Sequence, residues 1–504
     1  MATDAPTVGR QSVILALQLA LARSWVASVG DIRAAFLNGI PAPRKLYFRQ
    51  PRGGIPSLQG GQLVEVLKGV FGLSTSPKLW WTKLSTDLKD LKIEIDKNLI
   101  LKVRQNPIDP CVFMLIDCET EMVRGLLLTH VDDLMLLTEA QFQPIIHTRL
   151  KEKFPIDEWE VSKFEYVGCE FDYHSDYVKI TQLNYAQNRV DKVTILPEQK
   201  DEDLANRAQV EENRTSIGSL SWLSKQTRPD LQFAVSQAQK TQNAPTVKHL
   251  KATNKIVDMA RRHDNCGLTL WKIEEEDLVV MAYHDAAWGN TTLDDSSVPA
   301  DAWVGEHLVA SQLGALIVAM DRKALENNSG RFSLLHWQSK GCRRVCRSTF
   351  AGETMACSDA VEGGLFLRGL LVSMKLGRLI PEDECGRFMD FHCITDCKSL
   401  YDHVHREGTP KAPADKRLAI DLAALRQALA REGRHQWEKQ YNANHSDLAT
   451  PERPCRPPLH WLPTGEQLAD ILTKLMRADS WWMKIQQGTV ALPLRASQGN
   501  AHRI

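Results

Sequence analysis

Two adjacent carboxylates, Asp132 and Asp133, lie between two apolar runs in the segment 125–137. Each run has the length of a strand and is too short for a typical helix, so the pattern predicts a β-hairpin with the aspartates at its tip. Buried charges need a partner, and Mg²⁺ is a natural one because one or two carboxylates and substrate phosphates hold it. The alternative is an Asp-rich surface turn, which is the commoner fate of an arbitrary Asp-Asp pair. The strongly apolar flanks favour a metal site, which would need a third acid.

A candidate for this third acid lies far upstream. Residues 25–29 predict a short strand that leads into Asp31, and the segment Asp31–Gly39 predicts a helical turn ended by glycine. Before it, Gln11–Ala22 is apolar and predicts a buried helix. A further helix is expected to open at Lys78, because the preceding proline is favourable near a helix start.

Four more acids lie at the ends of predicted strands or on predicted helices in the second half of the chain. The strands are expected at 278–284, 308–320, 332–338, 391–395 and 459–462, and the helices from 349 onward and over 466–475. The acids are Asp285, Glu353, Asp396 and Asp470. Taken singly, each is more often a surface charge than a metal ligand. Their order, together with the segment Ala469–Lys474, favours a second site.

Length and composition set wide limits on the class of protein. The 504 residues allow roughly two to four domains. Lys+Arg and Asp+Glu both number 62, so any basic surface for nucleic acid must be local. Eleven cysteines without a pairing rhythm or a secretory signal indicate reduced intracellular thiols. The pairs Cys342/Cys346 and Cys393/Cys397 are more often packed thiols than zinc ligands.

The middle of the chain predicts helices and one basic helix face. Residues 196–213 are charged and predict a linker, residues 228–241 predict a helix, and residues 247–263 predict another. One face of the last helix carries basic residues spaced by three, four and seven positions: Lys248, Lys251, Lys255 and Arg262. This face could track a phosphate backbone. A solvated helix face explains the pattern equally well.

Several segments together resemble the copia-type reverse transcriptases of LTR retrotransposons. The segments that carry the resemblance are, in order, Asp31–Gly39, Tyr47–Gly53, Phe71–Trp81, Asp109–Phe113 and His130–Asp133. The resemblance continues through Ile217–Trp222 and Thr227–Asp230 and then through an RNase H-like stretch to Lys474. No single motif is decisive, but the collinear set is specific and covers nearly the whole chain. The set resembles the region of a Pol polyprotein that contains reverse transcriptase and RNase H.

The resemblance implies an α+β / α/β multidomain fold. Residues 1–195 would form the reverse-transcriptase palm, an antiparallel sheet with helices, which a hairpin within 165–181 would close. Residues 196–270 would form a helical thumb or connection region. Residues 271–480 would form an RNase H-like mixed sheet with flanking helices, and residues 481–504 a C-terminal tail.

The resemblance also implies the site residues and their partners. Asp31, Asp132 and Asp133 would hold two Mg²⁺ (or Mn²⁺) ions for polymerisation, and Asp285, Glu353, Asp396 and Asp470 would hold two more for cleavage of the RNA strand in an RNA–DNA hybrid. Nucleotide contacts would come from Phe36, Phe71, Gly72 and Pro77. The partners would be an RNA template, a DNA primer, the hybrid and dNTPs, in cytoplasmic particles or the nucleus.

The chain departs from the family pattern at four points. His130 replaces the tyrosine before Val-Asp-Asp, Ser74-Thr75 replaces Lys-Gln in the nucleotide loop, and Ala287 replaces the second acid of Asp-Ala-Asp-Trp. The fourth is that the family's fingers, with basic residues for the triphosphate, should lie upstream of Asp31. Their absence predicts a truncated or decayed copy.

These observations predict an RNA-directed DNA polymerase with RNase H activity from a copia-like element. Two alternatives stay open: an RNase H-only nuclease on an inactive palm, and a non-enzymatic nucleic-acid-binding remnant. Because positioning of the phosphates carries most of phosphoryl-transfer catalysis, we expect hybrid cleavage to exceed primer extension when the fingers are missing.

Overall fold

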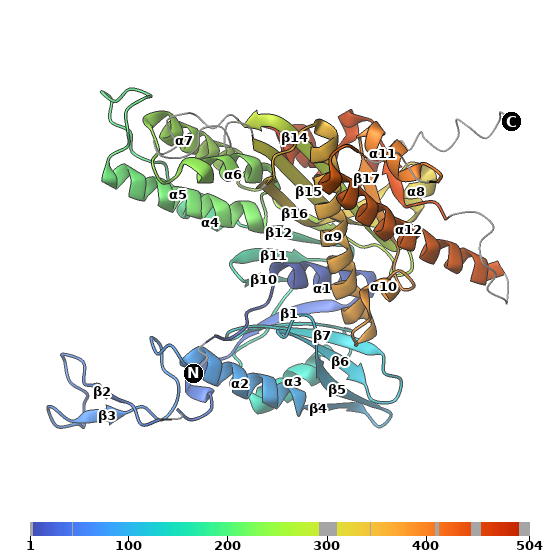
Figure 1. The fold of residues 1–504 in the computed structure, drawn as a ribbon. Helices are drawn as coiled ribbons and strands as arrows, with labels where there is room; N and C mark the ends of the chain where they lie inside the picture. Colours follow the sequence, from blue (N-terminus) through green and yellow to red (C-terminus); the bar gives the residue numbers. More distant parts are fainter. Residues whose placement is uncertain are drawn as a thin grey trace. The chain divides into compact units, whose positions relative to one another are not determined.

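The computed structural model describes residues 4–42, 44–291, 310–342, 344–408, 413–444 and 455–492. The chain forms two compact units (Figure 1). The first comprises residues 1–20, 24–167 and 373–379, and the second comprises residues 21–23, 168–372 and 380–504. Of the predicted tail, residues 493–504 lie outside the described residues, as do the first two residues of the strand predicted at 308–320.

The described part of the first unit contains a seven-stranded antiparallel sheet in the order β4-β5-β6-β7-β8-β1-β9. Its strands are β1 (Val26–Asp31), β4 (Lys92–Asp96), β5 (Leu99–Gln105), β6 (Val112–Asp117), β7 (Val123–His130), β8 (Asp133–Thr138) and β9 (Glu160–Val161). The short strands β2 (Tyr47–Arg49) and β3 (Leu63–Glu65) form a separate hairpin, and β10 (Lys163–Tyr166) follows β9. The apolar runs on either side of the two aspartates are therefore neighbouring strands, as the sequence predicted.

Two helices pack on one face of this sheet (Figure 1). The helical elements here are α1 (Arg10–Ala22), η1 (Ala35–Asn38), α2 (Ser76–Lys89) and α3 (Gln143–Lys153), where η denotes a 3₁₀-helix. Trp80, Leu84 and Leu88 recur at the spacing of one helix face and are buried against strands β5 to β8. The buried helix predicted at residues 11–22 is confirmed as α1.

The indole of Trp80 fixes the turn between β7 and β8. Its Nε1 donates a hydrogen bond of 2.6 Å to the carbonyl oxygen of Val131, the first residue of that turn. Val131 has φ of 57°, a left-handed conformation that is uncommon for a β-branched residue. A buried hydrogen bond at this carbonyl helps hold the strained backbone beside the two aspartates.

The second unit is built on a six-stranded mixed sheet, counted over its described residues, in the order β18-β17-β14-β15-β16-β19. The strands are β14 (Leu278–Thr291), β15 (Ala310–Asp321), β16 (Ser329–Gly341), β17 (Phe391–Thr395), β18 (Leu459–Trp461) and β19 (Thr489–Ala491). Strand β17 is parallel to both β14 and β18, and the other neighbours are antiparallel. The prediction that a strand ends at residue 284 was wrong, because β14 pairs with β15 on both sides of Asp285.

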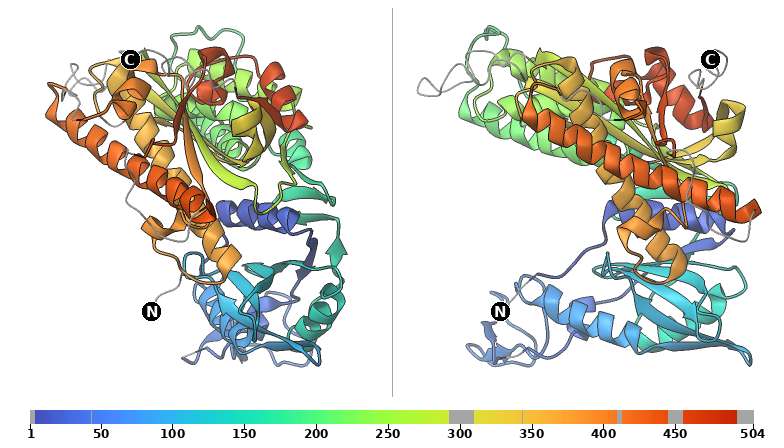
Figure 2. Two further views of the ribbon diagram at one scale, coloured as in Figure 1. Left: turned by 90° about the vertical axis from the view of Figure 1, so that its right-hand side faces the viewer. Right: turned by 45° about the vertical axis from the view of Figure 1, so that its right-hand side comes forward.

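Helices cover this sheet, and α9 and α12 are the longest of them (Figure 2). The elements are α8 (Lys323–Asn327), α9 (Thr349–Leu376), α10 (Glu382–Cys385), α11 (Lys398–His405), α12 (Lys416–Asn444) and α13 (Asp479–Gln487). The Cα of Gly364 lies so close to the Phe391 ring that a Cβ there would be 2.3 Å from it, which packs α9 tightly on β17. A buried ion pair between Arg368 and Glu432 joins α9 to α12.

The helix expected at 466–475 is not α-helical. The structure has two short 3₁₀ turns there, η4 (Thr464–Glu466) and η5 (Leu468–Leu472). Between them Gln467 is extended, its side-chain oxygen accepts from the Ala469 amide, and its Nε2 donates 2.9 Å to the carbonyl of His284. This anchoring to β14 interrupts the helical hydrogen-bond ladder.

A helical group within the second unit has its own apolar core. It comprises α4 (Leu183–Asn188), α5 (Arg207–Gln226), η2 (Pro229–Leu231), α6 (Gln232–Thr241) and α7 (Val247–Arg262), beside strands β11 (Cys169–Tyr173), β12 (Tyr177–Thr181) and β13 (Leu268–Trp271). The linker predicted at 196–213 was wrong from Arg207 onward. Asn206 and Gln209 form a capping box that starts α5, and the buried Asn213 accepts a hydrogen bond from Thr253. In the described residues, no helix is long and apolar enough to cross a membrane.

We expect Trp80→Phe to lower the free energy of unfolding by about 1–2 kcal/mol, because it leaves the half-buried Val131 carbonyl without its donor. Denaturant unfolding measures this change. Trp81→Phe is the matched control, since Trp81 is only partly buried on the same helix. Equal losses from the two substitutions would show that the hydrogen bond to the turn contributes nothing specific.

Candidate active sites

The first acidic cluster is assembled by strand pairing. Asp31 of β1 and Asp133 of β8 are direct partners in the antiparallel register, and Asp132 lies in the turn just before Asp133. One carboxylate oxygen from each of the three acids lies within 4.8 Å of the others. The structure thus brings together all three acids that the sequence singled out in this half of the chain.

The backbone around the cluster is fixed by further contacts. The amide of Ile32 donates 3.0 Å to the carbonyl of Asp132, and the amide of Asp157 donates 3.1 Å to that of Asp31. A Cβ at Gly30 would lie only 2.9 Å from Ile156 and 3.0 Å from Trp159. The missing side chain at this position therefore allows the chain after α3 to pack directly against β1, beside the acids.

The acids of this cluster repel one another. Burial raises the pKa of Asp133 to about 6, and the charges of Asp132, Asp31 and Glu165 add to the effect. Burial, followed by the charges of Asp132 and Asp157, also raises the pKa of Asp31. Burial lowers the pKa of His130, which favours a neutral ring next to the acids. A cation with oxygen ligands would relieve this repulsion.

The predicted nucleotide-contacting residues flank α2 and η1. Phe36 is partly buried against the core, and its ring meets that of Phe71 edge-on at 4.9 Å between centroids. Phe71 itself is 79% exposed, so this ring is available to a ligand. Gly72 has φ of 84°, which only glycine adopts without strain, and Pro77 lies at the start of α2.

The second acidic cluster draws on three elements of the second unit. Asp285 lies in β14, Glu353 near the start of α9, and Asp396 directly after β17. Carboxylate oxygens of these three lie within 4.8 Å of one another. Asp470, the fourth predicted acid, is linked to Asp285 through Lys474. The Nζ atom of Lys474 lies 2.9 Å from Asp470 and 3.6 Å from Asp285.

Close packing positions Asp285 against η5. A Cβ at Gly314, the strand partner of Asp285, would lie 2.9 Å from both Leu472 and Thr473. The absent side chain lets η5 approach the sheet, and Thr473 then donates a hydrogen bond to the buried carboxylate of Asp285. On the other side, the Trp461 indole donates 3.0 Å to the carbonyl of Asp396.

Electrostatic coupling extends over the second cluster as well. Burial raises the pKa of Glu353, and the charges of Asp285 and Asp396 raise it further, although His284 opposes them. Burial likewise raises the pKa of Asp470. Burial disfavours the charged form of Lys474, but the hydrogen bond to Asp470 and the charge of Asp285 outweigh it and raise the pKa of this lysine. Lys474 therefore acts as the resident counter-charge.

Sequence reasoning assigned no role to Lys474, Thr473 or His284. The first two lie in the segment 469–474 that had been singled out, so the signal was present, but their contacts to Asp285 depend on the fold. One close pair of cysteines follows the sequence spacing and another does not. The sulfur atoms of Cys342 and Cys346 are 3.6 Å apart, whereas the sulfur of Cys393 lies 3.8 Å from that of Cys357.

The basic side chains predicted on α7 are exposed, as expected for either interpretation. Lys251 forms an ion pair of 2.6 Å with Asp201. The charges of Lys248 and Lys255 also act on Asp201, whose pKa is lowered chiefly by its hydrogen bond to Lys251. An acid thus offsets part of the positive charge on this face.

The raised pKa of Asp133 predicts how the stability of the protein depends on pH. An acid whose pKa is raised by folding binds its proton more tightly in the folded state, so the metal-free protein loses stability as pH rises from 3.8 to about 6. Asp133→Asn should therefore stabilise the metal-free protein at neutral pH, by about 1–2 kcal/mol after allowance for solvent screening. The gain should vanish below pH 3.8.

Denaturant unfolding in EDTA across this pH range measures the effect, with the exposed Asp90→Asn as control. Adding Mg²⁺ should stabilise the wild-type protein more than Asp133→Asn. Destabilisation by Asp133→Asn at neutral pH without metal would contradict the proposed repulsion.

Comparison with known proteins identifies the first part of the chain. Residues 1–200 match the family model for reverse transcriptase (RNA-dependent DNA polymerase). The retrovirus-related Pol polyprotein from transposon RE2 of Arabidopsis thaliana is 25% identical over 309 residues, covering 58% of this chain and 20% of that protein. The corresponding polyprotein from transposon RE1 is 24% identical over 304 residues, covering 57% of this chain and 19% of that protein.

Among solved structures, a foamy viral protease-reverse transcriptase in complex with dsDNA aligns with 80% of this chain and 66% of its own, at 10% identity and a TM-score of 0.19. The chain spans about one-fifth of the length of the two polyproteins. The resemblance to copia-type Pol polyproteins is confirmed by the family model and these relatives. Residues 1–200 of this chain thus match the reverse transcriptase family model, and the chain is similar to the Pol polyproteins of retrotransposons.

Proposed function

We propose that this chain is an RNA-directed DNA polymerase with a second, RNase H site, and that each acidic cluster is one of its active centres. The single observation that carries the first assignment is the convergence of Asp31, Asp132 and Asp133 within the part that matches the reverse transcriptase family. The proposed domains are a palm over residues 1–195, a helical connection over 196–270, an RNase H-like domain over 271–480 and a tail over 481–504.

The donor atoms of both clusters fit divalent metal ions. Each cluster offers only carboxylate oxygens, which Mg²⁺ and Mn²⁺ prefer. Burial and then the neighbouring acids raise the pKa of Asp133 in the first cluster and of Glu353 in the second. We propose that Asp31, Asp132 and Asp133 hold the metals of the first site. When bound, such ions would polarise the phosphate and activate the attacking oxygen.

The residues of the first site would position the reactants. The turn held by Trp80 keeps Asp132 and Asp133 at the end of the β7–β8 hairpin. The exposed ring of Phe71 and the partly buried ring of Phe36 could bind the sugar and base of an incoming dNTP by apolar contact. The exposed lysines of α7 would contact the backbone of the RNA template or DNA primer.

The topology of the second unit supports the RNase H assignment. Three antiparallel strands, β14 to β16, continue into two parallel strands, β17 and β18, in one mixed sheet with α9 against it. The acids lie on β14, on α9, after β17 and on η5, in the order that the family resemblance implied. We propose that these acids bind metals and cut the RNA strand of an RNA–DNA hybrid, with Lys474 holding Asp470 and Asp285 together until metal binds.

One protein preparation can test both sites. We expect Asp132→Asn to reduce Mg²⁺-dependent primer extension on an RNA template by at least about 100-fold and to leave cleavage of a labelled RNA–DNA hybrid unchanged. Asp396→Asn should have the opposite effect, because each substitution removes a metal ligand in a different unit.

The exposed Asp90→Asn and Asp402→Asn are matched controls, one in each unit, and should change neither rate. Hybrid cleavage without any primer extension by the wild-type chain would favour a nuclease on an inactive palm. Binding of the hybrid with neither activity would favour a nucleic-acid-binding remnant, and both results would refute the proposed polymerase.

A further inference from the structure

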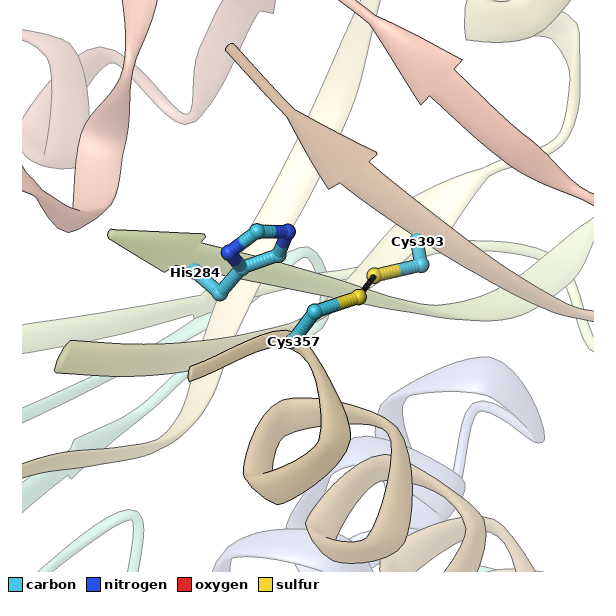
Figure 3. A group of neighbouring side chains, drawn as sticks. All are labelled: His284, Cys357 and Cys393. Carbon is cyan, nitrogen blue, oxygen red and sulfur yellow. Dashed lines mark hydrogen bonds between the residues drawn. The ribbon is translucent and has the colours of Figure 1, made fainter. Parts of the chain in front are cut away.

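A second type of metal-ligand cluster lies beside the RNase H acids. His284 of β14, Cys357 of α9 and Cys393 of β17 converge in the interior of the second unit (Figure 3). One ring nitrogen and two sulfur atoms lie within 4.8 Å of one another, and the two sulfur atoms are 3.8 Å apart. The exposed fraction of each of these residues is 0%.

The imidazole of His284 lacks the hydrogen bonds that a buried ring normally makes. Among the described residues, neither of its ring nitrogens has a partner with hydrogen-bond geometry, although Nδ1 lies 3.4 Å from the Glu353 carboxylate. Leaving a buried polar atom unsatisfied destabilises the folded state. A ligand that accepts the nitrogen lone pair would remove this cost.

The two cysteines are close enough to share one ion. Their sulfur atoms are 3.8 Å apart, and both side chains are fully buried. Metal ions bind the thiolate and not the thiol. Two sulfur atoms and one imidazole nitrogen form a softer donor set than the carboxylates nearby, and such sets select Zn²⁺ or Cu(I) over Mg²⁺.

We propose that His284, Cys357 and Cys393 bind a thiophilic metal ion of the Zn²⁺ class. Three protein ligands leave one position of a tetrahedral ion open for a further donor. The site is separate in chemistry from the acidic cluster, and it does not depend on the proposed nuclease function. It shares Cys393 with one of the cysteine pairs noted in the sequence, but Cys357 takes the place of Cys397.

The placement of the ligands gives such an ion a structural role. His284 immediately precedes Asp285, Cys357 lies one helical turn after Glu353, and Cys393 lies three residues before Asp396. The two clusters adjoin, because Nδ1 of His284 lies 3.4 Å from the carboxylate of Glu353, which is one of the three acids. An ion at His284 would therefore fasten β14, α9 and β17 to one another directly beside those acids.

Cobalt absorption spectroscopy on the full-length protein tests the site. The reduced protein is freed of metal with a chelator and titrated with Co²⁺, which replaces Zn²⁺ in such sites. We expect a near-ultraviolet thiolate-to-cobalt band at one ion per chain that Zn²⁺ abolishes. The band should be lost in Cys357→Ala and in Cys393→Ala, and it should persist in Asp396→Asn, which disturbs only the acids.

The double variant Cys342→Ala/Cys346→Ala is the matched control, because it removes the other close sulfur pair. It should keep the band. Zn²⁺ should also raise the unfolding temperature of the wild type by several degrees but not that of a folded Cys393→Ala variant, with folding checked by circular dichroism.

Three results would overturn the proposal, and two of them do not require that the Cys357 or Cys393 variants fold. These two are a wild-type spectrum without a thiolate band and a band that disappears in the Cys342→Ala/Cys346→Ala control. The third is a full band in Cys393→Ala. A failure of hybrid cleavage in every preparation would refute the proposed nuclease but would leave the cobalt spectrum, and hence this site, unaffected.

Discussion

Repulsion between neighbouring carboxylates is the constraint on which both clusters depend. Bringing three acids within 4.8 Å of one another costs free energy, and the backbone structure that brings them together must supply the compensating stability. In the first unit, strand pairing places Asp31 opposite Asp133. In the second, the sheet and α9 converge on Asp285 and Glu353. The folded state is therefore less stable than it would be without these neighbouring charges, but the same negative charge would attract a metal ion.

The two clusters balance this charge differently. In the second, the ammonium group of Lys474 lies close to Asp470 and Asp285, so part of the negative charge is compensated without metal. In the first, each cause that acts on the pKa of Asp133 raises it, which means that burial and neighbouring acids act together. The first cluster should therefore be the more dependent on divalent cations for its own stability.

The sequence singled out the six acids that converge in the two clusters because their signals are local. Asp132 and Asp133 interrupt an apolar pattern of period and length typical of a hairpin, and the order of motifs carried the family resemblance. What could not be predicted depends on contacts between distant segments. Cys357 meets Cys393 across 36 residues, and Thr473 reaches Asp285 across 188. The helical start at Arg207 was missed because charged residues suggested a linker, whereas its stability comes from a capping box and the buried Asn213.

Because of the register between β1 and β8, the first cluster is sensitive to insertions and deletions, an effect that point substitutions do not test. Side chains alternate between the two faces of a strand, so a slip of one residue moves every side chain to the other face. A deletion or insertion of one codon within β8 would keep both aspartates in the sequence and yet exchange the side chains that pack on the two faces of the strand, both of which are buried. Loss of two codons would restore the faces but shorten the strand. In related elements that accumulate such errors, a frame-preserving single-codon gap in this hairpin would be a stronger sign of inactivation than many amino-acid replacements elsewhere.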